Sequence, residues 1–222
     1  QFNKAADGHF FTATDLAKDW VKSKRQLKKV MPIMEGSSFF NFSERDHNRN
    51  FELVERIKAR SITGVNGQKV FIWVGRLNKN KDPLTVLNGL EKVMLNDPGI
   101  ELYMIYGTDE LSGEVKSRIE SSSTLKDHVH LIGPIPHQNL ESWYQSAHYF
   151  IAGSHYEGSG YALSESMSCG CVPIVTAIPA FKEMTKNGAT GVLWKPGNVN
   201  SLHDAIRETL KKPWEKEAQK AI

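Results

Sequence analysis

The feature that most restricts the fold of this chain is a regular alternation of short apolar segments with amphipathic ones, beginning near residue 68. Most of the apolar segments are apolar along their centres instead of strictly alternating, as expected for strands buried on both faces. They are Val70–Gly75, Glu101–Gly107, Val129–Gly133, Tyr149–Gly153, Cys171–Thr176 and Gly191–Trp194. Strand starts recur roughly every 20 to 30 residues, the spacing of βα units. The pattern predicts an α/β fold with a Rossmann-like, doubly wound parallel sheet of about six strands.

Helical patterns fill the intervals between these strands. The first begins with Asp82-Pro83, an N-cap residue followed by proline in the first turn. The predicted helices are Asp82–Leu95, Ser112–Glu120, Gln138–Ala147, Tyr161–Ser168, Ala180–Thr185 and Ser201–Leu210.

Residues 1–65 do not follow the alternation. They suggest a short strand before Thr14, a helix near Asp15–Lys24, a strand within Lys28–Met34 and a helix over Arg49–Ser61. Such a fragment is too small to enclose a core, so it must pack on the later domain or on something absent. We therefore divide the chain into residues 1–65, a sheet domain over 66–211, and a tail over 212–222 that is helical around Trp214.

Composition excludes several classes of protein. The 222 residues are 40% hydrophobic, enough for a sizeable core, and the formal charge of +3 is too small to indicate a nucleic-acid partner. No apolar run approaches the ~20 residues of a membrane span. Cys169 and Cys171 are one residue apart, which disfavours a structural disulfide and offers too few ligands for a metal, so we expect no metal and a cytoplasmic location. Because the chain begins at Gln1, we expect it to be processed or cut from something longer.

The first predicted strand is followed by GRLNKNKDP, which carries Arg76 and Lys81. Ligands of open parallel sheets bind at the carboxyl ends of the strands. Positive charge beside a helix N-terminus is unfavourable unless an anion binds there. Cations that converge at such a position therefore suit a diphosphate. A solvated basic loop is the simpler alternative.

The fourth predicted strand is followed by a glycine-rich turn between two carboxylates, Glu157 and Glu165. Gly158 and Gly160 would let the backbone approach a ligand closely, and the N–H groups at the helix start would face an anion. The carboxylates would accept hydrogen bonds from vicinal hydroxyls, a sugar on one side and a ribose on the other. Alternatively, Glu165 only favours the helix start and Glu157 lies on the surface. We expect His155 to be the only histidine near this cleft.

Five segments in order resemble the C-terminal, nucleotide-sugar-binding domain of the retaining GT-B glycosyltransferases of glycosyltransferase family 4 (group 1). The resemblance runs from about Val70 to Leu210 and rests on GRLNKNK, HLIGPIP, EGSGYALSE followed by SMSCGCVPIV, AIPAFKEM and GVLWKPG. It implies a catalytic set of Arg76 and Lys81, on the donor diphosphate, and Glu157, on the transferred sugar. It also implies a donor-binding set of Gly75, Gly133, Ile135, Ser159, Gly160, Tyr161, Ala162 and Glu165, with Glu165 on the ribose and the loop around Ile132–Pro136 at the base.

The resemblance implies transfer of a hexosyl unit with retention of configuration, in polysaccharide, lipopolysaccharide or glycolipid synthesis. The donor would be a UDP-, GDP- or ADP-linked sugar without a further cofactor. The acceptor would be a glycan or a lipid-linked sugar, met in the cytoplasm or at the inner face of the membrane. Residues 1–65 would then be the remnant and linker of an N-terminal acceptor domain, whose absence implies little transfer by the chain alone.

Two departures and several alternatives remain at this stage. Ser159 stands where the family commonly has an aromatic residue. Val30–Phe40 lies where the family has the segment that precedes the interdomain linker, but its sequence does not match that segment. A non-catalytic nucleotide-sugar-binding module would use the same residues, and the fold also serves phosphorylases and nucleotide-sugar 2-epimerases. A dinucleotide-dependent dehydrogenase is disfavoured, because GRLNKN lacks the Gly-x-Gly-x-x-Gly pattern.

Overall fold

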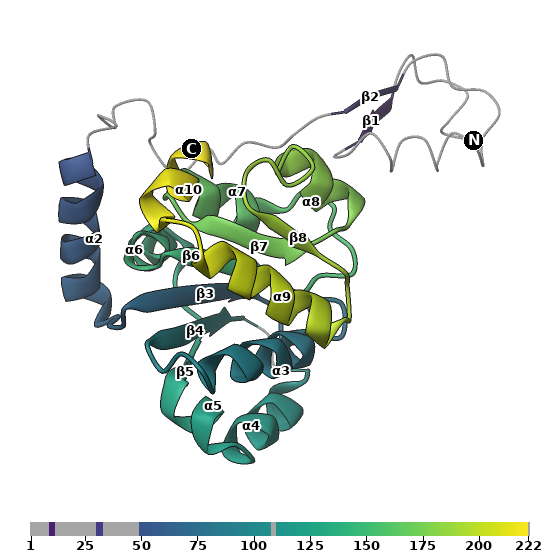
Figure 1. The fold of residues 1–222 in the computed structure, drawn as a ribbon. Helices are drawn as coiled ribbons and strands as arrows, with labels where there is room; N and C mark the ends of the chain where they lie inside the picture. The colour runs from purple at the N-terminus through teal and green to yellow at the C-terminus, as the bar shows by residue number, and fades with distance from the viewer. Residues whose placement is uncertain (1–8, 12–29, 33–48, 108–109, 222) are drawn as a thin grey trace.

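The computed structural model describes residues 9–11, 30–32, 49–107 and 110–221, and its main body is a parallel sheet covered by helices on both faces (Figure 1). The sheet has six strands in the order β5-β4-β3-β6-β7-β8. The strands are β3 (Lys69–Gly75), β4 (Ile100–Tyr106), β5 (Val129–Gly133), β6 (Tyr149–Ala152), β7 (Val172–Thr176) and β8 (Val192–Trp194). All six coincide with predicted apolar runs, so the doubly wound parallel sheet is confirmed.

The strand order places a topological switch point at β3. The chain first adds β4 and β5 on one side of β3, and then returns to lay β6 along its other side, with Phe71 opposite Tyr149. The connections that leave β3 and β6 therefore run to opposite faces, and a crevice opens between them at the carboxyl edge of the sheet.

Two apolar clusters lie on the two faces of the sheet. One is built with α3 (Pro83–Met94) and α9 (Val199–Leu210), and it includes Leu87, Leu90 and Leu202. The other includes Tyr144, Leu163 and Phe181, supplied by the helices α6 (Leu140–Ser146), α7 (Tyr161–Ser168) and α8 (Pro179–Met184). Burial from both sides explains why the strands are apolar throughout.

The predicted helices are present, with two local differences. The expected helix Gln138–Ala147 begins as a separate 3-10 turn, η2 (His137–Asn139), before α6. Ser112–Glu120 is α4 as predicted, but it is followed by a short helix that the sequence reading missed, α5 (Ser123–His128). Ser122 caps α5 by accepting from the N–H of Leu125, so a serine-rich stretch that reads as a loop closes into a helical turn.

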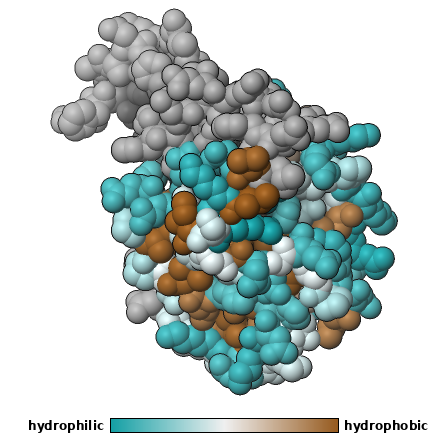
Figure 2. All heavy atoms as spheres, turned by 90° about the vertical axis from the view of Figure 1, so that its left-hand side faces the viewer, coloured by the Kyte–Doolittle hydropathy of each residue, from teal (hydrophilic) through white to brown (hydrophobic). Residues whose placement is uncertain are grey.

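The first part of the chain contains β1 (His9–Phe11) and β2 (Val30–Pro32), which pair in parallel, and α2 (Arg49–Thr63). The predicted helix Asp15–Lys24 lies outside the described residues. The face of the molecule that carries α2 mixes apolar and hydrophilic side chains (Figure 2), and the exposed apolar residues of α2 include Val54, Ile57 and Ile62.

Helix α2 packs against the sheet domain through Arg56. Its guanidinium donates to the carbonyl oxygens of Gln145 and Ala147 at 3.3 and 3.2 Å, and lies 3.8 Å from the centre of the Trp214 ring. Trp214 begins the tail helix α10 (Trp214–Ala221), so α2 and α10 meet at this ring. The domain boundary at residue 65 stays a prediction. Within the part of the chain that the structure covers, no helix is both long and apolar enough to cross a membrane.

Candidate functional site

The loops that follow β3 and β6 approach each other closely at the switch point. A Cβ on Gly153, just after β6, would lie 2.9 Å from the carbonyl oxygen of Asp82, so only glycine fits this approach. Asn80 joins the loops: its carbonyl accepts from the N–H of His155 at 2.8 Å, and its side chain bonds both the N–H and the carbonyl of Tyr156 at 3.0 Å. The two loops thus form one unit.

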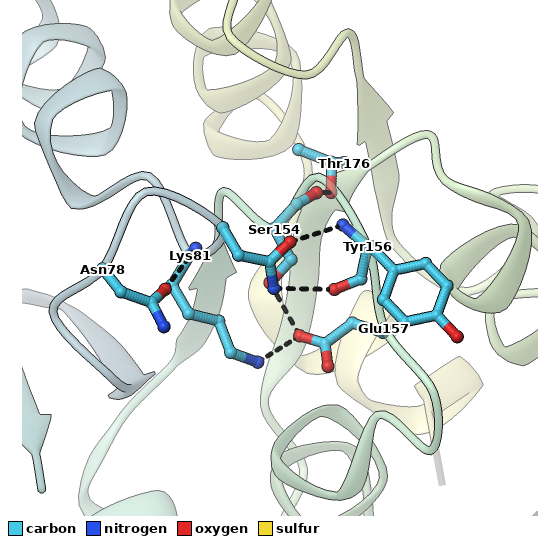
Figure 3. A network of polar contacts seen from close by, with 7 residues as sticks. Asn78, Lys81, Ser154, Tyr156, Glu157 and Thr176 are labelled. Atoms are coloured by element: carbon cyan, nitrogen blue, oxygen red, sulfur yellow. Dashed lines mark hydrogen bonds and ion pairs between the residues drawn. The ribbon is translucent and has the colours of Figure 1, made fainter. Parts of the chain in front are cut away.

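An ion pair between Lys81 and Glu157 spans the crevice (Figure 3). Glu157 also accepts a hydrogen bond at 2.7 Å from the hydroxyl of Ser154, a residue that is almost completely buried. The carbonyl of Ser154 is in turn bonded by the hydroxyl of Thr176, at the end of β7. Three strand ends therefore fix the position of the Glu157 carboxylate.

Helix α7 starts at the edge of the same crevice. Gly160 is its N-cap residue and has a φ of 66°, in the left-handed region that favours glycine. The N–H groups of Leu163 and Ser164 bond to the carbonyl of Gly160. The N–H groups before them belong to the first turn of a helix, where the backbone has no helical acceptor and the dipole favours an anion.

These groups line one pocket of about 340 Å³. Its polar lining includes Lys81, Ser154 and Glu157, together with residues 158–160 of the turn. Its apolar lining includes Trp73, Phe150 and Phe181. Such a pocket offers a cation and helix N–H groups to an anion, a carboxylate to hydroxyls, and an apolar surface to a ring. Within the described ranges, no three His, Cys, Asp or Glu side chains gather closely enough to hold a metal ion.

Glu165 occupies a second, separate position. Its side chain lies one turn inside α7, is buried with 6% exposure, and is not part of the pocket lining. His137 Nε2 lies 2.7 Å from Oε1, and the Tyr144 hydroxyl donates to Oε2 at 3.3 Å. Burial, together with the charge of Glu165, raises the pKa of Tyr144 well above its ordinary value, so this hydroxyl stays protonated. The two glutamates therefore face different surroundings.

The structure brings some of the predicted site residues together and leaves others apart. Glu157 and Lys81 meet in the pocket with the turn that contains Ser159, Gly160, Tyr161 and Ala162. Gly75 and Gly133 end their strands, and the Ile135 side chain packs against the apolar cluster under α6. Arg76 is exposed on the loop after β3 and does not line the pocket. The ligand-binding roles of all these residues stay predictions.

One histidine, His155, was singled out from the sequence as near the cleft, and this residue contacts Asp82 at 3.1 Å. His137, which contacts Glu165 at 2.7 Å, was not singled out. Sequence reasoning also missed Asn80 and Ser154 as residues that hold the loops. The bonds that reveal Asn80 and His137 join positions 76 and 28 residues apart, which no local motif encodes.

Comparison with known proteins gives a consistent result. The family model of the group 1 glycosyl transferases matches residues 55–222. The chain is 26% identical over 177 residues to the GDP-mannose:cellobiosyl-diphosphopolyprenol alpha-mannosyltransferase of Xanthomonas oryzae pv. oryzae, covering 74% of this chain and 47% of that protein. The chain thus spans less than half of this relative's length.

Solved structures show the same fold. Alr3699/HepE from Anabaena, solved in complex with UDP, superposes with a TM-score of 0.82 at 16% identity, over 99% of this chain and 58% of that one. The C-terminal domain of the group 1 glycosyl transferase LpcC from Francisella tularensis gives a TM-score of 0.66 at 20% identity, over 75% of this chain and 88% of that one. These similarities support the GT-B sheet domain as the architecture.

Proposed function

We propose that this chain, which belongs to the group 1 glycosyl transferases, forms the donor-binding half of a glycosyltransferase that moves a hexosyl unit from a nucleotide sugar with retention of configuration. The acceptor, a glycan or a lipid-linked sugar, would meet the donor in the cytoplasm or at the inner face of the membrane. We place the acceptor site on a further domain, in the part of the longer relative's length that these 222 residues do not span.

One observation carries the proposal: Lys81, Glu157 and the start of α7 line a single pocket at the switch point of the sheet. A nucleoside diphosphate would lay its phosphates against the α7 N–H groups and Lys81, and the sugar hydroxyls would reach Glu157. The pocket is preorganised, because Asn80 and Ser154 already hold its loops. The complex of the Anabaena neighbour with UDP supports this class of ligand.

The Lys81–Glu157 ion pair gives the site a specific starting state. An incoming diphosphate would compete with the Glu157 carboxylate for Lys81, and the carboxylate would then be available to the sugar. Charge builds on the leaving phosphate as the bond to the sugar breaks. Fixed cations and helix N–H groups stabilise that charge without reorganising at the moment of reaction. We assign Glu157 to positioning and electrostatics, and Arg76 to the leaving group.

Isothermal titration of the chain with UDP, GDP and ADP, alone and as sugar nucleotides, tests the binding step. We expect one of the three nucleotides to bind, and Lys81→Met to weaken its affinity by about tenfold or more, as expected for a lost charge-assisted contact. Lys79→Met is the matched control: it removes the same charge two residues away, from a side chain that is exposed and outside the pocket. Equal losses of nucleotide affinity in the two variants would show that the effect comes from the overall charge of the protein, and would contradict the proposed site.

A transfer assay separates an enzyme from a binding module that uses the same residues. We expect little or no transfer by these 222 residues alone. In the full-length protein, Arg76→Ala should lower turnover far more than donor affinity, because it acts on the leaving group. A full-length protein that binds donor but transfers nothing to any acceptor would favour the binding module.

A further inference from the structure

Glu165 is a buried carboxylate that two different segments hold in place. Its oxygens meet the His137 imidazole, from the turn η2, and the Tyr144 hydroxyl, from α6. A carboxylate so far removed from water needs such donors, since burying it unpaired is costly. Because the carboxylate only accepts, His137 must carry its hydrogen on Nε2 and donate it to Oε1.

The contact with His137 links two parts of the expected nucleoside site. Strand β5 ends at Gly133, and the loop around Ile132–Pro136, which was predicted to meet the base, leads directly to His137 at the start of η2. The His137 side chain is 47% exposed, so its ring lies between solvent and the buried carboxylate. The hydrogen bond therefore ties the end of this loop to the helix that carries Glu165.

The two donors leave part of the carboxylate available. A carboxylate has about four acceptor positions, two on each oxygen. The bonds from His137 and Tyr144 orient the group, and we assign its remaining acceptor positions to a pair of vicinal hydroxyls. Without the bond from His137, the carboxylate would lose this orientation.

We propose that His137 is a positioning residue, which holds Glu165 in the orientation that binds the vicinal hydroxyls of the donor ribose. The inference rests on the proposed function, because it assumes that a nucleotide enters the site. His137 itself does not touch the reacting atoms. It acts through Glu165, so it governs nucleotide affinity and leaves the chemical step to Lys81, Arg76 and Glu157.

The test measures the affinity of two His137 variants for two forms of the same ligand. His137→Gln keeps an N–H donor close to the position of Nε2, whereas His137→Asn places its amide where Nδ1 was and cannot reach Glu165. Dissociation constants are measured by titration for UDP, GDP and ADP, and for the 2′,3′-dideoxy form of whichever nucleotide binds. His130→Asn is the matched control, since His130 forms a similar bond of 2.8 Å to Glu101 elsewhere in the sheet.

We expect His137→Asn to weaken the ribonucleotide about tenfold, the effect of one lost hydrogen bond to a charged group. The dideoxy nucleotide should bind the variant and the wild type equally, because it lacks the hydroxyls that Glu165 would hold. His137→Gln should recover most of the lost affinity, and His130→Asn should change nothing.

Three results would overturn the inference. Unchanged affinity of His137→Asn for the ribonucleotide would remove any role in binding. An equal loss for both ligand forms would show that His137 supports the fold of the loop and not the ribose contact. A wild-type chain that binds none of the three nucleotides would overturn the proposed function, and this inference with it.

Discussion

Replacing Gly160 by alanine tests whether the backbone at the start of α7 is as tightly specified as the structure indicates. Gly160 has a φ of 66°, and a Cβ there would lie 2.7 Å from the Met184 sulfur. Gly158, two residues earlier in the same Gly-x-Gly turn, lacks a left-handed φ, and a Cβ on it would have no atom within 4 Å. The two glycines look alike in the sequence, yet only Gly160 is constrained.

The expected cost has two parts. Holding alanine in the left-handed region costs roughly 1–2 kcal/mol. Alanine also lowers the entropy of the unfolded chain, which returns about 0.4–1 kcal/mol, but the contact with Met184 requires that side chain to move and adds a cost. We expect Gly160→Ala to lower the free energy of unfolding by about 1–2 kcal/mol, and Gly158→Ala to stay within about 0.5 kcal/mol of the wild type.

Urea unfolding, followed by tryptophan fluorescence, measures these changes as shifts in the midpoint at constant slope. In thermal melts, Gly160→Ala should lower Tm by roughly 2–8 °C for a domain of this size. Equal stability of the two alanine variants would refute the reasoning, because it would mean that the turn relaxes and the left-handed backbone carries no cost.

Two further predictions concern a buried histidine and a close approach of loops. Burial, with Arg56 and Arg60 nearby, lowers the pKa of His148 to about 3, and its Nδ1 accepts the Val70 N–H at 3.0 Å. Since the unfolded chain binds this proton near pH 6.5 and the folded chain does not, stability should fall by up to about 1.4 kcal/mol per unit as pH drops from 6.5 toward 3. Urea titrations at several pH values should show that slope reduced in His148→Asn, which keeps an acceptor; an unchanged slope would contradict this assignment. Gly153→Ala should push the β3 and β6 loops apart, which should lower both the melting temperature and the affinity for nucleotide. A thermal melt and a titration measure these two properties, and a loss of only one of them would contradict the expectation.

The sequence was sufficient to predict the parallel sheet. Burial of both faces requires strands that are apolar throughout, and this requirement is written locally into runs such as Val70–Gly75 and Tyr149–Gly153. The same alternation predicted that ligand-binding groups would follow the strands at the carboxyl edge. The helix start at Tyr161 was also readable, because the Gly-x-Gly turn before it is a local signal. In contrast, α5 was missed, since six residues carry too little periodicity to distinguish a helical turn from a loop.

Local patterns in the sequence identified which residues could form the site, whereas the packing of the whole domain set which of them meet. Glu157 was expected to face sugar hydroxyls, and the fold pairs it with Lys81, 76 positions earlier. Glu165 was expected to hold the ribose hydroxyls, and the fold buries it in contact with His137 and Tyr144. The physical reason is that strand and helix patterns are set by neighbouring residues, whereas these contacts depend on how β3, β5 and β6 are ordered in the sheet. That order is fixed by packing across the whole domain, and no short segment contains it.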